Sequence, residues 1–112
     1  MSLDVIFSSG EVKDIELEYK GEKIALKIRE LSWSERNKIL SHCFTYQSDG
    51  SITFDFEKYH KESLKKIITS APWGETNEMF FARISPGFGS MLEKLVPKAF
   101  EEIKTNDFFV KE

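Results

Sequence analysis

The sequence predicts an α+β fold, in which an N-terminal antiparallel β-hairpin forms a small sheet and a bundle of about four helices follows it. Three observations lead to this prediction. Apolar and polar residues alternate over residues 13–30, the sequence LSWSE then changes the period to that of a helix, and Asp-Gly, Pro and Gly residues divide the rest into helix-length segments. A chain of 112 residues fits a single domain. We expect the hairpin at about 12–29, the helical part at about 32–104 and a flexible C-terminal tail at 105–112.

The predicted hairpin turns at Lys20-Gly21. A two-residue loop at this point fixes which residues of the two strands face each other. It gives the apolar pairs Ile15–Leu26 and Leu17–Ile24 on one face, and the charge pairs Asp14–Lys27 and Glu18–Lys23 on the other. Apolar faces and charge pairs therefore agree on one register.

The first helix is predicted to begin at Trp33, because Ser32 and Glu35 have the spacing of a capping box. Its apolar stripe is expected to lie against the hairpin and consists of Trp33, Leu40, Cys43 and Phe44, with Ile39 at the edge. The sequence QSDGS is expected to end it. We expect Trp33→Ala to cost about 3 to 5 kcal/mol if the ring is buried, and less than about 1 kcal/mol if it lies at the surface.

A second helix is predicted at about 56–70. Asp55 is the expected N-cap, and Phe54 and Tyr59 stand at the two positions of a hydrophobic staple. The sequence NEMFFARI predicts a third helix of two turns.

The fourth helix is predicted to start after Ser85 as N-cap, with Pro86 in its first turn. Apolar residues continue at helical spacing from Phe88 to Ile103, and Pro97 requires a kink or a restart near Val96.

Composition excludes several classes of protein. The net charge of −3 without a basic block argues against nucleic-acid binding. No apolar run reaches the roughly 18 to 20 residues of a membrane span, and the N-terminus has no signal-peptide pattern, so we expect a cytoplasmic protein. A single cysteine cannot form an intrachain disulfide, and we expect no metal, no cofactor and no catalytic residues.

Four features are weighed as sites and interpreted as structural. His42 and Cys43 are adjacent in a predicted helix and so do not face each other. The sequence SPGFGS lacks the lysine of a phosphate-binding loop and is interpreted as a turn that leads into a helix. His60 is expected to be a solvated helix residue. Arg29 and Arg36 flank the junction and are expected to form a salt bridge with Glu35 or Glu30; a contact with a partner is the alternative.

Lysines at helical spacing could form a basic face only in the folded chain, and a solvated face is the other interpretation; they are Lys58, Lys61, Lys65 and Lys66. The aromatic residues are the stronger signal, since ten Phe are many for a core of this size. Phe44, Phe54, Phe56, Phe88 and Phe100 are assigned to the core. The candidate protein-binding residues are Trp73, Phe80, Phe81, Phe108 and Phe109, with Trp33 a further surplus ring; the alternative is that these also lie in the core.

The β element followed by the pattern R-x-L-S-W-x-E-R resembles the tail assembly chaperones of long-tailed bacterial and archaeal viruses and their prophages. The matching residues are Arg29, Leu31, Ser32, Trp33, Glu35 and Arg36, and the wider match, with FGSMLEKLVP, covers most of residues 12–104.

The resemblance implies a non-enzymatic assembly factor that binds a helical client, the tape-measure protein, aids tail polymerisation in the host cytoplasm and self-associates. The alternatives are a structural tail or head-tail connector subunit and, with less support, a nucleic-acid-binding regulator. A long open β edge would distinguish the structural subunit from a chaperone with a helical client groove.

Overall fold

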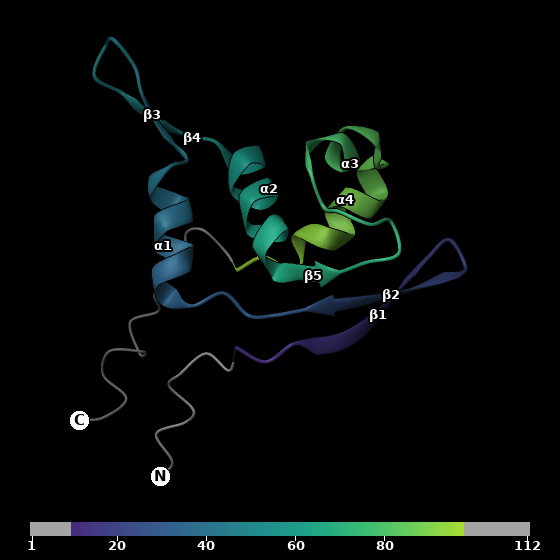
Figure 1. Cartoon of the computed structure of the whole chain (residues 1–112). Coiled ribbons are helices and arrows are strands. Elements are labelled where there is room, and N and C mark those ends of the chain that lie inside the picture. The colour runs from purple at the N-terminus through teal and green to yellow at the C-terminus, as the bar shows by residue number, and fades with distance from the viewer. Residues whose placement is uncertain (1–9, 98–112) are drawn as a thin grey trace, which may run out of the picture.

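The computed structural model describes residues 10–97 and has an α+β fold, as the sequence predicts (Figure 1). The strands are β1 (Lys13–Tyr19), β2 (Glu22–Ile28), β3 (Phe44–Tyr46), β4 (Ile52–Phe54) and β5 (Ile68–Ser70). The helices are α1 (Trp33–Ser41), α2 (Phe56–Ile67), α3 (Glu78–Arg83) and α4 (Pro86–Glu93). One sheet has the strand order β1-β2-β5, and β3 and β4 form a second, two-stranded sheet.

The β1–β2 hairpin has the predicted register, with Leu17 opposite Ile24 and Asp14 opposite Lys27. Its two loop residues, Lys20 and Gly21, have φ of 53° and 83°. Positive φ at both positions is typical of a type I′ turn, whose twist matches that of the strands. The ion pairs follow only in part: Lys27 Nζ lies 3.3 Å from Asp14 Oδ1, whereas Lys23 Nζ lies 4.0 Å from the diagonal neighbour Glu16, not within ion-pair distance of Glu18.

Helix α1 starts at Trp33 with the predicted capping box, but its predicted packing is wrong. It contacts mainly α2, and its buried side chains are Ile39 and, just after the helix, Cys43. Trp33 is 78% exposed. It precedes Ile39 by six residues, which places it about 120° away around a helix of 3.6 residues per turn.

The chain after α1 also differs from the prediction, because α1 ends at Ser41 and residues 44–46 form a strand. Phe44-Thr45-Tyr46 pairs with Ile52-Thr53-Phe54, so the alternating apolar residues of both runs share one face. Aromatic and β-branched residues favour strands, and this preference overrides the helical spacing of Cys43 and Phe44.

Helix α2 has the predicted N-cap, Asp55, whose carboxylate accepts the Lys58 N–H at 3.0 Å. The staple is present too, with the rings of Phe54 and Tyr59 5.8 Å apart. The helix ends at Ile67, three residues earlier than predicted. Ile68–Ser70 instead extends the sheet as β5, where Ile68 pairs with Ile28 of β2.

The core lies between the sheet and the helices that cover one of its faces (Figure 1). Its fully buried side chains include Leu26 of β2, Tyr59 and Leu64 of α2, and Phe88 and Leu92 of α4. Phe88 is thus a core residue as predicted. Phe44 and Phe56 were assigned to the core as well, but both are exposed, because Phe44 lies in the β3–β4 hairpin and Phe56 opens α2.

Helix α4 begins as predicted, with the Ser85 hydroxyl accepting the Phe88 N–H at 3.3 Å. It ends at Glu93, and a tight turn leads to Pro97, whose carbonyl accepts a hydrogen bond from the Tyr59 hydroxyl at 2.6 Å. The predicted helix is thus interrupted before Pro97, as expected, but already at Glu93, three residues before Val96. Its continuation to Ile103, together with the core assignment of Phe100 and the predicted tail 105–112, lies outside the described residues.

Candidate functional site

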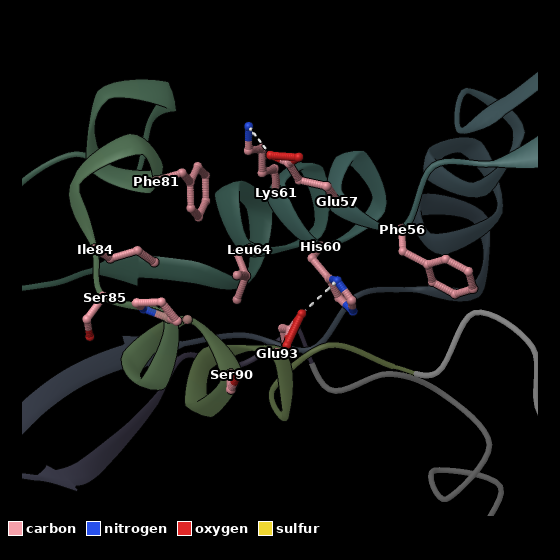
Figure 2. Close-up of a pocket in the computed structure, with 12 residues that line it drawn as sticks. Phe56, Glu57, His60, Lys61, Leu64, Phe81, Ile84, Ser85, Ser90 and Glu93 are labelled. Carbon is pink, nitrogen blue, oxygen red and sulfur yellow. Dashed lines mark ion pairs between the residues drawn. The ribbon is translucent and has the colours of Figure 1, made fainter.

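A groove of about 440 Å³ runs between α2 on one side and α3 and α4 on the other (Figure 2). Leu64 of α2 forms its floor and is buried, and Phe81 and Ile84 close one end. Phe56 stands at the other end and is 55% exposed. A concave surface with an apolar floor is the usual form of a binding site in proteins.

Polar side chains border this floor and compensate one another in charge. On α2, Lys61 Nζ lies 2.9 Å from Glu57 and 3.1 Å from Glu78 of α3. His60 Nδ1 lies 3.3 Å from Glu93 of α4, so this pair connects the two walls (Figure 2). His60 is half-buried, and its predicted role as a solvated residue is wrong because α4 packs beside it.

Of the three predicted contact residues within 10–97, only Phe81 reaches the groove. Phe81 lines it, whereas Trp73 and Phe80 stack on each other beside it, with ring centroids 4.4 Å apart. The Trp73 indole N–H donates to Thr76 Oγ1 at 3.0 Å. All three rings are half-buried, so they both support the core and show one side to solvent. Phe108 and Phe109 lie outside the described residues.

A second hollow, of about 460 Å³, adjoins the groove at Ile84 and Ser85. Its walls are the rings of Tyr19 and Trp73, and Phe88 forms its floor. The ring centroids of Tyr19 and Trp73 lie 5.4 Å and 5.8 Å from that of Phe88. Trp73 therefore belongs to an aromatic hollow next to the groove and not to the groove itself.

The β3–β4 hairpin carries exposed apolar side chains that the sequence prediction missed. Tyr46 and Ile52, which pair with each other, are 76% and 55% exposed. Phe56 continues this surface toward the groove, since its ring lies 4.7 Å from that of Phe54. A signal was present: the runs FTY and ITF flank QSDGS, and two alternating runs around an Asp-Gly turn indicate a hairpin.

The residues considered as candidates for catalysis or metal binding have structural roles. Cys43 is buried, its thiol donates to the Ile39 carbonyl at 3.1 Å, and burial raises its pKa. A thiol in this state is a weak nucleophile. Within residues 10–97, no group of three or more His, Cys, Asp and Glu side chains could hold a metal ion.

Two of the four lysines of α2, Lys61 and Lys65, form ion pairs, which reduces a basic face. Besides the contacts of Lys61, Lys65 Nζ lies 2.9 Å from Glu78 and 3.6 Å from Glu62. Hydrogen bonds with Lys65 and Lys61 lower the pKa of Glu78. Nucleic-acid binding requires cations that are available to phosphates, so this arrangement does not favour it.

The salt bridge predicted for Arg29 is formed with Glu35. Arg29 Nη1 and Nη2 donate to the two oxygens of Glu35 at 2.9 Å and 2.8 Å. This bidentate pair joins the end of β2 to the start of α1 and occupies the residues that carry the R-x-L-S-W-x-E-R pattern. Arg29 and Glu35, two residues of the pattern, therefore have a structural role at the junction between β2 and α1.

Comparisons with protein-family models, with curated proteins and with solved structures found no match. Among the described residues, no helix is both long and apolar enough to cross a membrane.

Proposed function

We propose that this protein is a non-enzymatic assembly factor that binds an amphipathic helical segment of another protein in the groove between α2 and α4. The groove is the observation that carries this proposal. Helix-in-groove recognition uses a concave apolar floor that receives the apolar stripe of the partner helix. Leu64, Phe81, Ile84 and Phe56 provide such a floor and its two ends.

The rim supports the same type of partner. The polar groups on either side of the floor already have partners: the Glu57 carboxylate lies beside the Lys61 ammonium, and the Glu93 carboxylate lies beside the His60 imidazole. The binding energy of a partner therefore comes mainly from burying apolar surface on the floor. Exposed rings such as Phe56 are the residue type that dominates such energies.

The resemblance to tail assembly chaperones suggests the client, a tape-measure protein with long helical segments. A chaperone of this kind would act in the cytoplasm, that of the host if the protein is viral, and would cover the apolar stripes of the client until the tail subunits polymerise around it.

Co-expression with a tape-measure protein as the client tests this proposal. We expect the wild-type protein to keep the client soluble and to co-purify with it. Phe56→Ser should weaken binding about tenfold, because it removes an exposed ring from one end of the groove. Met79→Ser is the matched control: Met79 is 69% exposed and lies on α3 but does not line the groove.

Two results would contradict the proposal. In the first, the wild-type protein leaves the client insoluble and does not co-purify with it. In the second, Phe56→Ser and Met79→Ser bind the client as tightly as the wild-type protein, which would place the contact outside the groove.

A structural tail or connector subunit is the second candidate, and one observation favours it. Among residues 10–97, no strand pairs with the outer side of β1, and an edge of this kind can join subunits into rings by pairing with another edge strand such as β5. Sedimentation of the purified protein separates the two candidates, since a ring-forming subunit sediments as a discrete large oligomer without a client.

A further inference from the structure

The outer edge of β1 is a second surface that can bind a protein segment. β1 has seven residues, contains no proline and pairs with β2 without a bulge. Natural edge strands are usually short, bulged or interrupted by proline, which protects them from further pairing. The groove between α2 and α4 has no lining residue from β1, so the two surfaces are separate.

The backbone groups that face this edge can be identified from β2. The Lys27 carbonyl accepts a hydrogen bond from the Thr69 hydroxyl, and the Arg29 N–H donates to the Ile67 carbonyl. The backbone N–H and C=O groups of the odd-numbered residues on this side of β2 therefore point to β5. Those of the even-numbered residues of β2 point to β1, where they pair with odd-numbered residues. Backbone directions alternate along a strand, and the N–H and C=O groups of Asp14, Glu16 and Glu18 therefore point to the open edge.

The inner face of the sheet is incompletely covered along this edge. Leu26 of β2 is 2% exposed, whereas its partner Ile15 and the neighbouring Leu17 on β1 are only half-buried. Apolar residues of an added strand would lie beside these two side chains and remove the rest of their surface from water. In Figure 1 the helices lie above β2 and β5, and β1 lies farther from them; the start of α4 reaches β1 at Tyr19, whose hydroxyl is 2.9 Å from that of Ser85.

The acidic side chains of β1 on the outer face of the sheet determine which charge is favourable on an added strand. The side chains that β1 shows there are Asp14, Glu16 and Glu18, and β2 places lysines beside them, at 3.3 Å for Lys27–Asp14 and 4.0 Å for Lys23–Glu16. Opposite charges on neighbouring strands are favourable and like charges are not. A basic strand on the open side of β1 would repeat the favourable arrangement.

We propose that the outer edge of β1 binds an extended protein segment in which basic and apolar residues alternate, and that this segment adds to the sheet as a fourth strand. The β1 strand of a second copy does not fit, because two antiparallel β1 strands that share their apolar face and overlap along their length would place acidic residues beside acidic residues.

Titration of the full chain with a seven-residue peptide of alternating lysine and valine tests this proposal. Binding should slow hydrogen exchange of the Asp14, Glu16 and Glu18 amides about tenfold or more, because these amides become hydrogen-bonded. The Leu17 amide, which faces β2, should keep its rate. A peptide of the same composition with its lysines grouped, and one of alternating glutamate and valine, should bind at least about fivefold more weakly.

Two variants of Glu16 test the open edge: the proline variant loses both the outward N–H and the carboxylate, whereas the lysine variant keeps the N–H and reverses the charge. Glu16→Pro removes an outward N–H and leaves the ladder to β2 intact, as edge positions permit. Glu16→Lys reverses one charge. Both should weaken the alternating basic peptide about fivefold or more, since each removes a favourable contact and the second adds a repulsion. Glu75→Lys changes the net charge equally in a loop and should bind like the wild-type chain.

The proposal is overturned if the grouped-lysine peptide binds as well as the alternating one, since the interaction would then be unspecific attraction. It is also overturned if both Glu16 variants keep wild-type affinity. Protection of the same three amides by self-association in the absence of peptide would likewise refute it, because the occupant would then be a second copy.

Discussion

At the scale of the residue, Glu35 determines how α1 begins. Its carboxylate accepts the Ser32 backbone N–H at 3.0 Å and both donors of Arg29. These hydrogen bonds, that of Arg29 above all and then that of Ser32, lower the pKa of Glu35 to about 2. The charged form is therefore favoured in the folded protein, and one side chain ties the cap of α1 to the end of β2.

This lowered pKa makes stability depend on pH. The contribution of Glu35 is complete above its ordinary value of 4.5 and is lost as the pH falls from there toward 2. The whole shift corresponds to about 3 kcal/mol, and because both side chains are partly exposed we expect Glu35→Gln to cost about 1 to 2 kcal/mol at pH 7. Urea unfolding at pH 7 and at pH 2 should show that the free energies of unfolding of the wild type and of Glu35→Gln differ less at the lower pH. An equal difference at both would mean that the cap geometry, and not the charge, stabilises this junction.

Trp33 provides a second prediction at this scale. Because its ring is 78% exposed, Trp33→Ala should cost less than about 1 kcal/mol in the free energy of unfolding. Leu26→Ala is the comparison: Leu26 is buried in the core, and its truncation should cost about 2 to 5 kcal/mol. Denaturant unfolding of both variants measures the contrast. A loss above 2 kcal/mol for Trp33→Ala would show that the ring is covered.

At the scale of the element, the two hairpins differ in how they are supported. β1–β2 is part of a larger sheet and lies under the helices, whereas β3–β4 has only two strands. Isolated two-stranded hairpins are only marginally stable in water, so the stability of β3–β4 depends on the contacts at its base. There the Asp55 N–H donates to the Cys43 carbonyl at 2.8 Å and the rings of Phe44 and Phe54 lie 5.1 Å apart.

The turn of the first hairpin gives a prediction for this scale. Gly21 has a φ of 83°, a conformation that alanine adopts only at a cost of about 1 to 2 kcal/mol. Gly21→Ala should therefore lower the free energy of unfolding by about that amount, whereas Lys20→Asn should leave it unchanged or raise it, because asparagine suits the first position of this turn. Thermal unfolding of the two variants tests both signs. A Gly21→Ala protein as stable as the wild type would mean that the turn can take another form.

At the scale of the whole molecule, α4 is attached to the sheet where it crosses β1. The Tyr19 and Ser85 hydroxyls are 2.9 Å apart, and the ring of Tyr19 lies 5.4 Å from that of Phe88. Gly87 lets this ring approach, since a Cβ at that position would lie 2.7 Å from the Tyr19 hydroxyl. The position of α4, and with it one wall of the groove, therefore depends on a contact between segments far apart in the sequence.

Substitutions of the two helical glycines test this attachment. Gly87→Ala should destabilise the protein by about 1 to 3 kcal/mol, because the stiff tyrosine ring must move away. Gly89→Ala is the matched control: its Cβ would meet only the end of Ile84, at 3.5 Å, and alanine favours the helix by up to about 1 kcal/mol. Unfolding in urea compares the two. If the two variants are equally stable, the ring of Tyr19 moves away from an alanine at position 87 without a cost in the free energy of unfolding.

The sequence by itself determined the elements whose signals are local. Strict alternation fixed the β1–β2 register, and side chains three residues from the backbone groups they cap fixed the starts of α1, α2 and α4. These interactions involve neighbours along the chain, so their geometry follows from spacing alone.

Only the tertiary structure decided where these elements end and which surfaces they leave open. Ile68 continues a helical pattern but becomes a strand because β2 offers it a pairing edge, and Trp33 is exposed because α1 turns toward α2. The groove combines side chains of three helices, and the candidate residue Trp73 lies beside it because its ring stacks on Phe80. Contacts of this kind depend on how distant segments pack, which periodicity does not encode.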